Sequence, residues 1–293
     1  MDRRRFVRNL AAGAAGLSLP VAPWKISTAS DTVTITVLHT NDMHSHIEPF
    51  VSEDERYSGR GGLARISALV KQIREENPDT LLFDAGDMFQ GTPYFNYFGG
   101  ELMFSLMSEI GYDAGTIGNH EFDNGLEGIL SPLPQAKFPL VSSNYDFSDT
   151  ILAGKFPGWK IFRNKGIKTG IYGLGIELKG LVADKNFGET QYRDPLKIAL
   201  EMENFLRNDQ KCDLVVCLSH LGHRYGENKI SDLIIGGHTH TYLEKPVSVR
   251  NKQGREVIVN QAWWGGLVLG RIDFVFDSTG KKKKAITGLS LNG

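Results

Sequence analysis

The 293-residue sequence contains only two cysteines and no marked excess of either charge, since its net charge is −1. Cys212 and Cys217 lie five positions apart, so their side chains should point to opposite faces of the strand expected there. We therefore predict no disulfide between them. Neither belongs to a thiolate metal pattern, and both are interpreted as small buried hydrophobic residues. The balanced charge gives no indication of nucleic-acid binding.

The sequence also lacks a long apolar run, an internal repeat and a linker. Residues 10–20 are mildly apolar, but they are fewer than the roughly 20 residues that a membrane-spanning helix needs. They follow Arg3, Arg4 and Arg5 and precede the small residues 27–29, a pattern typical of a twin-arginine export signal. We predict a signal peptide at residues 1–29, one domain at residues 30–293 and a periplasmic location. A basic amphipathic helix at the membrane surface is the alternative, but the run has no polar face.

The hydrophobic periodicity predicts helices that alternate with strands, followed by strands alone from residue 245 onward. The expected helices are 62–75, 102–110 and 195–206, the last with Asp194 as its N-cap. The expected strands are 33–38, 80–83, 113–117, 138–141, 214–218, 233–235, 247–249, 257–259, 267–276 and 285–291, with a hairpin formed by 161–162 and 170–174. The basic run 281–284 is expected in a solvent-exposed hairpin turn. This order favours an α/β (α+β) domain in which two sheets pack face to face with helices outside.

Clusters of polar residues follow five of the expected strands. They read Asn41-Asp42-Met43-His44, Gly86-Asp87, Gly118-Asn119-His120-Glu121-Phe122-Asp123, Ser219-His220 and Gly236-Gly237-His238-Thr239-His240. In open α/β sheets, ligands bind at the carboxyl ends of the strands, where such loops converge. Any one of these motifs is weak by itself, but five in this order are specific.

These motifs, over residues 33–276, resemble the calcineurin-like metallophosphoesterase superfamily, in its 5′-nucleotidase and UDP-sugar hydrolase branch. The resemblance implies a four-layer αββα sandwich of the metallo-dependent phosphatase type. It also implies two divalent metal ions, for which carboxylate, amide and imidazole ligands suit Mn, Zn, Fe or Co. The first metal would be held by Asp42, His44, Asp87 and His240, and the second by Asp87, Asn119, His220 and His238. Asp87 would bridge the two metals, and a metal-bridging hydroxide would attack phosphorus.

The resemblance assigns a catalytic dyad to His120 and Asp123, in which the carboxylate orients the imidazole and the imidazole protonates the leaving oxygen. Asn119 and His120 would also contact the substrate. Trp263 and Trp264 are adjacent after a strand and cannot easily both be buried, so we expect one of them to form a stacking wall for a flat group at the cleft mouth.

Other residues have simpler interpretations. His39 is expected to be a packed core histidine or a donor to a ligand, and His46 and His223 to lie at the rim. Glu121 is expected to be structural, in a salt bridge. The aromatic residues Phe89, Phe95 and Phe98 are expected to pack in the core.

The expected function is a metal-dependent phosphoric ester hydrolase, specifically a 5′-nucleotidase-like phosphomonoesterase acting in nucleotide catabolism. The alternatives are a phosphodiesterase or nucleotide-sugar pyrophosphohydrolase of the same fold, and a non-catalytic subunit of a split nucleotidase. Two-domain relatives carry a C-terminal domain that grips the base and the phosphate. A separate chain that supplies such a domain is therefore a candidate partner, beside a phosphorylated small-molecule substrate.

Overall fold

Two six-stranded sheets form the centre of the molecule. The computed structural model describes residues 32–287 except 52, 53, 55, 226–229 and 252, together with residues 291 and 292. The predicted signal peptide at residues 1–29 lies outside the described residues. Among the described residues, no helix is both long and apolar enough to cross a membrane.

The first sheet has the strand order β13-β12-β1-β2-β3, and β14 pairs with β12. Its strands are β1 (Val33–Thr40), β2 (Leu81–Asp84), β3 (Ala114–Gly115), β12 (Val268–Phe276), β13 (Lys282–Thr287) and β14 (Leu291–Asn292). Strand β1 runs parallel to β2 and antiparallel to β12, and β3 runs parallel to β2. The central position of β1 suits its β-branched run at residues 33–37, because both faces of the strand are covered.

The second sheet has the order β10-β11-β9-β8-β6-β5. Its strands are β5 (Trp159–Asn164), β6 (Ile167–Leu174), β8 (Leu214–Ser219), β9 (Leu233–Gly236), β10 (Val247–Arg250) and β11 (Glu256–Asn260). Strands β6, β8, β9 and β11 are mutually parallel, and β5 and β10 are antiparallel edges. Strands β5 and β6 form the predicted hairpin. A separate two-stranded sheet joins β4 (Tyr145–Asp146) to β7 (Gln191–Tyr192).

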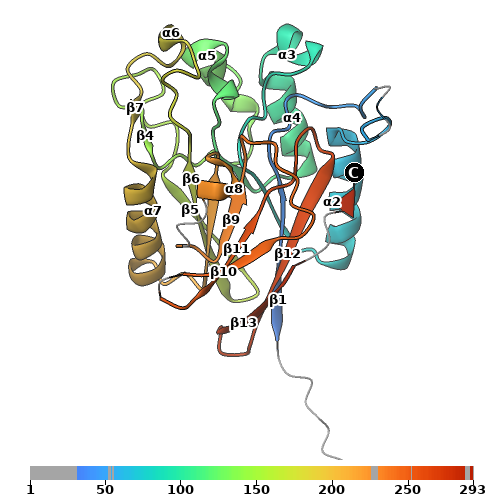
Figure 1. Ribbon diagram of the computed structural model, residues 1–293, viewed down its shortest axis with the longest axis vertical. Helices are drawn as coiled ribbons and strands as arrows, with labels where there is room; N and C mark the ends of the chain where they lie inside the picture. Colours follow the sequence, from blue (N-terminus) through green and yellow to red (C-terminus); the bar gives the residue numbers. More distant parts are fainter. Residues whose placement is uncertain are drawn as a thin grey trace, which may run out of the picture. The chain divides into compact units, whose positions relative to one another are not determined.

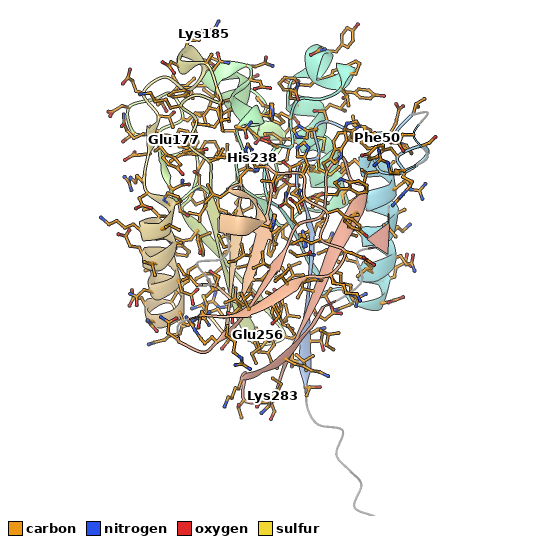
Figure 2. The ribbon with its side chains drawn as sticks, viewed as in Figure 1. Phe50, Glu177, Lys185, His238, Glu256 and Lys283 are labelled. Atoms are coloured by element: carbon orange, nitrogen blue, oxygen red, sulfur yellow. The ribbon has the colours of Figure 1, made fainter. Side chains whose placement is uncertain are left out.

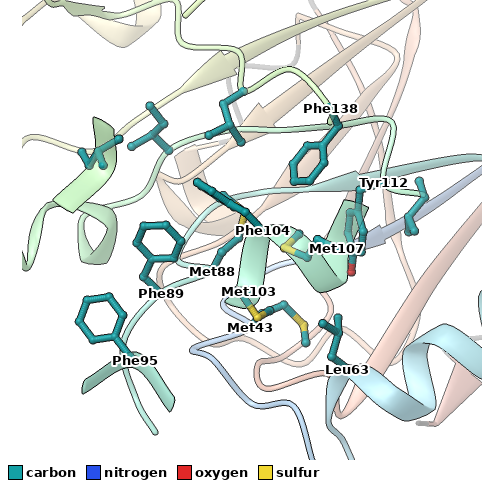
Figure 3. Close-up of a cluster of buried hydrophobic side chains, with 14 of the residues drawn as sticks. Met43, Leu63, Met88, Phe89, Phe95, Met103, Phe104, Met107, Tyr112 and Phe138 are labelled. Carbon is teal, nitrogen blue, oxygen red and sulfur yellow. The ribbon is translucent and has the colours of Figure 1, made fainter. Parts of the chain in front are cut away.

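The predicted four layers are present, with helices on the outer face of each sheet (Figure 1). Helices α2 (Leu63–Glu76) and α4 (Glu101–Ile110) cover the first sheet, and α7 (Pro195–Asn204) covers the second. The side chains of β1 alternate accordingly. Ile35 and Val37 lie between the two sheets, whereas Leu38 packs toward the outer helices. Figure 3 shows part of that outer core, in which Met103, Phe104 and Met107 of α4 belong to the same cluster as Leu63 of α2.

Short helices occupy the connections. They are α3 (Pro93–Phe98), α5 (Gly125–Leu130), α6 (Asp184–Phe187), α8 (Gly222–Tyr225) and the 3₁₀ helices η1 (His120–Phe122) and η2 (Leu133–Gln135). Helix α7 begins as predicted, because the Asp194 side chain accepts hydrogen bonds from the N–H groups of Leu196 and Lys197. Its predicted end is different, since the chain continues from Asn204 as a π-helical turn, η3 (Phe205–Asp209).

Two strand predictions and one turn prediction need correction. The strand expected at 113–117 is only the two-residue β3, and that expected at 138–141 makes a single bridge between Leu140 and Gly115. The basic run 281–284 is not a turn. The turn precedes it, and β13 already begins at Lys282, whose ammonium group forms an ion pair with Asp232. Both cysteines are free and buried, as predicted.

Candidate active site

The predicted ligands lie on loops at the carboxyl ends of strands from both sheets. The loop after β1 runs beside the loop after β2, because the Asp42 N–H donates a hydrogen bond to the Gly86 carbonyl at 2.9 Å. His220 connects the second sheet to the same loops, because its Nδ1 donates a hydrogen bond to the Ala85 carbonyl at 2.7 Å. Figure 2 shows His238 where β9 ends, in the middle of the molecule.

Asp42, His44 and His240 form the first cluster of candidate ligands. One possible ligand atom from each lies within 4.8 Å of the other two. The Nε2 atoms of His44 and His240 are 2.9 Å apart, and the Nε2 of His240 is 3.6 Å from Asp42 Oδ1. Two imidazole nitrogens and a carboxylate oxygen that face one another are the donor set of a divalent transition metal.

Asp87, His220 and His238 form the second cluster, with the same spacing limit of 4.8 Å. The Nε2 of His220 lies 3.0 Å from Asp87 Oδ2. Asn119 joins this group, because its Oδ1 is 2.9 Å from Nδ1 of His238. All seven side chains predicted as ligands are therefore gathered in the two clusters or beside them.

The burial of the two carboxylates supports metal binding. Asp42 is 0% exposed and Asp87 is 1% exposed. In the described part of the chain, their only ion-pair partners are histidines. Burial raises the pKa of Asp42 well above its usual value, and the nearby Asp87 raises it further although His220 lowers it. Two buried carboxylates in one site are unfavourable without cations, so this donor set fits two divalent ions.

Backbone conformation is unusual at five of the seven candidate ligands. Asp42, His44, Asp87, His238 and His240 have φ of 50°, 47°, 56°, 71° and 46°. The left-handed region is uncommon for residues other than glycine, and such residues cluster at functional sites. Periodicity in the sequence gives no signal for this feature.

His120 and Asp123 form the contact expected of a dyad, with 2.8 Å between Nδ1 and Oδ2. The hydrogen bond that His120 donates to Asp123 raises the pKa of His120 to about 8, although partial burial opposes the shift. The His120 backbone N–H donates to Asp87 Oδ1 at 2.8 Å, which fixes η1 against the second cluster. Its ring lies 5.1 Å from that of His44, so the imidazole borders the first cluster as well.

Glu121 has a more specific role than the sequence predicts. It forms no salt bridge within the described residues. Its carboxylate instead accepts hydrogen bonds from four backbone N–H groups, those of Asp87 (3.0 Å), Met88 (2.7 Å), Phe89 (3.2 Å) and Gly118 (2.6 Å). The side chain thereby joins the loops after β2 and β3. Its only sequence signal is its position in the tight turn after His120.

Asn41 is a contributor that sequence reasoning missed. Its Nδ2 donates to Asp42 Oδ2 at 2.5 Å and to the Trp263 carbonyl at 2.6 Å, while its Oδ1 accepts from the Ala262 N–H at 2.7 Å. Asn41 therefore fastens the loop after β11 to a candidate ligand. The feature of the sequence that could have identified Asn41 is its position directly before Asp42.

The two tryptophans have different neighbours, although both are half-buried. Trp264 lies parallel to the ring of His240, with 5.5 Å between centroids and 8° between planes. Trp263 instead stacks on Tyr242, at 5.2 Å and 23°, and lies 5.5 Å from Tyr57. The neighbouring side chains thus diverge, as expected from their adjacency.

The remaining predictions have mixed outcomes. His39 is a buried core histidine, and its Nε2 is 2.9 Å from Asn260 Nδ2. His46 is half-buried and stacks on Phe50, with 4.1 Å between ring centroids. Phe89 and Phe95 are buried as expected. The prediction for Phe98 is wrong, because this side chain at the end of α3 is 52% exposed.

Comparison with known proteins gives a consistent family assignment. A family model for calcineurin-like phosphoesterases matches residues 35–242. A snake venom 5′-nucleotidase from Gloydius brevicauda is 32% identical over 287 residues, which cover 89% of this chain and 48% of that protein. The human 5′-nucleotidase is 32% identical over 84% of this chain and 47% of its own length. The chain thus spans about half the length of these relatives.

Solved structures resemble the chain over a similar extent. The 5′-nucleotidase precursor from Thermus thermophilus has 32% identity and a TM-score of 0.79, and the match covers 89% of this chain and 55% of that one. The NAD nucleotidase from Haemophilus influenzae has 28% identity and a TM-score of 0.77, covering 89% and 51%.

Proposed function

Since this chain belongs to the calcineurin-like phosphoesterase family and is thereby a phosphoester hydrolase, we propose that it is a 5′-nucleotidase-like phosphomonoesterase with two divalent metal ions. One observation carries the proposal. Two clusters, each with a buried carboxylate and two imidazoles, meet beside the His120–Asp123 pair. The identity of 32% to 5′-nucleotidases supports the choice of substrate.

Seven side chains would hold the metals. Asp42, His44 and His240 would bind one ion, Asn119, His220 and His238 the other, and Asp87 both. When bound, the ions would supply positive charge for the phosphate and lower the pKa of water from about 15.7 toward 7. The protein itself fixes the ligand atoms. Backbone carbonyls orient the rings of His44 and His220, leaving each Nε2 free to bind.

His120 would act on the phosphoryl group. Its Nδ1 is held by Asp123, so its Nε2 is left for the substrate. One third of its side chain is exposed, at 33%, which gives a bound ester access to the ring. In the protonated form it would bind developing negative charge and donate its proton to the leaving oxygen. Asn119, one residue earlier, would contact a phosphate oxygen.

A nucleoside leaving group would stack beside the metal clusters. Trp263 and Tyr242 provide the flat surface, and Tyr242 is 40% exposed. Tyr242 follows His240 by two positions, which places this surface next to the first cluster. Stacking of a base on an aromatic side chain contributes about 1–3 kcal/mol. The stacking wall is thus assigned to Trp263 and not to Trp264, whose ring faces His240.

A substrate panel tests the proposal directly. The purified chain with Mn²⁺ should hydrolyse 5′-AMP faster than 3′-AMP, bis-p-nitrophenyl phosphate, a cyclic nucleotide or UDP-glucose. Trp263→Leu should raise the KM for 5′-AMP while leaving the KM for glycerol phosphate unchanged. A preference for the diester or for a pyrophosphate would contradict the monoesterase assignment.

A pyrophosphohydrolase is the second candidate. The structural match to a NAD nucleotidase, at 28% identity, is the observation in its favour. NAD and UDP-glucose in the panel distinguish the two activities. We also propose export to the periplasm by the twin-arginine route, from the sequence pattern of residues 1–29, and the partner chain expected from the resemblance stays a prediction.

A further inference from the structure

The candidate ligand His240 is held differently from His44 and His220. Nδ1 of His44 donates to the Phe89 carbonyl at 3.2 Å, and Nδ1 of His220 donates to the Ala85 carbonyl at 2.7 Å. Such hydrogen bonds orient metal-binding histidines and fix the tautomer. Throughout the part of the chain that the structure describes, Nδ1 of His240 makes no hydrogen bond of this kind. With 41% of its side chain exposed, His240 would be free to rotate unless something else restrained it.

Trp264 is in a position to restrain it. The indole covers one face of the His240 ring, with planes only 8° apart. The centroid distance of 5.5 Å lies in the range of offset-stacked aromatic pairs. The stacked orientation leaves the Nε2 of His240 directed at His44, 2.9 Å away, and at Asp42.

The indole is itself held from several sides. Its edge contacts Phe50, with centroids 5.0 Å apart, and His46, at 5.3 Å. The backbone beside it is fixed, because the Gly265 N–H donates to the Asp42 carbonyl at 2.7 Å and the Gly62 N–H donates to the Gly265 carbonyl at 2.8 Å. Trp264 is therefore fixed in place by the rings and the backbone around it.

We infer that Trp264 is a positioning residue for His240, and that ring stacking replaces here the backbone hydrogen bond that orients His44 and His220. The inference rests on the proposed function only in taking Asp42, His44 and His240 as a metal site. It assigns different roles to adjacent tryptophans. Trp264 would act on the metal site through His240, whereas Trp263 faces Tyr242 and, among the described residues, makes no ring contact with a candidate ligand.

Metal titration tests this role without measuring activity. The metal-free full-length chain is titrated with Mn²⁺ alone by calorimetry. Trp264→Leu should weaken one of two Mn²⁺ sites by about threefold to tenfold and leave the other unchanged. Trp264→Phe, which keeps a ring on His240, should restore the affinity. The matched control Trp263→Leu should bind both ions as the wild type does.

A double-mutant cycle separates positioning from general loosening of the loop. His240→Ala should weaken the same Mn²⁺ site, and adding Trp264→Leu to it should have no further effect on metal affinity. Additive losses would overturn the inference, as would equal weakening of both sites by Trp264→Leu or failure of Trp264→Phe to restore binding. If wild type binds two Mn²⁺ ions but hydrolyses no phosphomonoester, the proposed function fails while this inference stands.

Discussion

Several residues of the site adopt backbone conformations that are rare for residues other than glycine. Five candidate ligands lie in the left-handed region, among them Asp87 with φ of 56°. The neighbouring Gly118 leaves no room for a side chain, because a Cβ there would lie 2.2 Å from Asp87 Oδ1. Strain of this kind costs about 1–3 kcal/mol per residue and is retained where the surroundings enforce it. Two of the five are held in this way, since the Asp87 N–H donates to Glu121 and Asn41 donates to the Asp42 carboxylate.

Asp87 is the residue on which metal binding should depend most. Asp87→Asn replaces the proposed bridging carboxylate by a neutral amide that cannot neutralise either ion, so much of both metals should be lost together with activity. Elemental analysis of metal per chain measures this. The control Asp146→Asn, in a surface ion pair with Arg193, should keep the wild-type content. A variant of Asp87 that retains both ions would show that this residue is not the bridge.

His120 should affect chemistry without affecting the metals. His120→Ala should keep both ions and the thermal stability but lower kcat by roughly 10²–10⁴, the usual contribution of a positioned acid. The kcat for an alkyl phosphate should fall more than the kcat for an aryl phosphate, because the poorer leaving group depends more on protonation. Steady-state kinetics on both esters measure the difference. Equal losses would mean that His120 stabilises charge without donating a proton.

At the level of elements, a cluster of ion pairs around Asp232 links helix α7 to strands of both sheets. Asp232, directly before β9, accepts from Arg207 Nη2 at 2.6 Å and from the Val215 N–H at 3.0 Å, and it also pairs with Lys282. Glu203 of α7 binds the same arginine at 2.6 Å. The group connects α7, β8, β9 and β13, and Lys282 is the member of the basic run 281–284 that takes part in it.

Asp232 should make stability depend on pH. Burial alone would raise its pKa, but Arg207 and Lys282 outweigh burial and hold the pKa below its usual value. Its contribution should therefore be complete above the unfolded pKa of about 3.9 and be lost as the pH falls through the lower folded pKa. Asp232→Asn should lower the free energy of unfolding at pH 7 by about 3–5 kcal/mol, because it leaves Lys282 without its carboxylate partner and Arg207 with Glu203 alone.

Urea denaturation of both chains at pH 7 and at progressively lower pH checks this prediction. The difference between wild type and Asp232→Asn should shrink toward low pH. The control Asp79→Asn removes an exposed ion pair with Lys165 at 3.7 Å and should change stability by less than about 1 kcal/mol. A pH-independent difference would assign the effect to packing and not to charge.

At the level of the whole molecule, the remaining prediction concerns export. Changing Arg3, Arg4 and Arg5 together to lysine should retain the protein in the cytoplasm, because lysine lacks the guanidinium group that the twin-arginine route is expected to recognise. Cell fractionation followed by immunoblotting measures the distribution. Lys283→Arg, far along the chain, is a neutral control. Normal export of the triple variant would point to another route.

The sequence by itself determined the order of strands and the chemistry of the site. Period-two and period-3.6 patterns reflect burial along one element, so the main strands and helices could be read locally. The polar motifs follow strand ends in the chain, which predicts that they converge at one site. The seven candidate ligands and the pairing of His120 with Asp123 were predicted from the resemblance of these motifs to the metallophosphoesterase superfamily. Strands 113–117 and 138–141 were overestimated, because apolar residues can be buried without joining a ladder.

Only the tertiary structure decided which side chains meet across the two sheets. Asn41 reaches the Trp263 carbonyl across 222 positions, and His39 reaches Asn260 across 221. Such contacts depend on how the sheets pack, and no local pattern encodes them. The same reason applies to the four N–H groups on Glu121, to the exposure of Phe98 and to the face of Trp264 that covers His240. Residue types and spacing specify the reactive groups, whereas packing specifies how they are held.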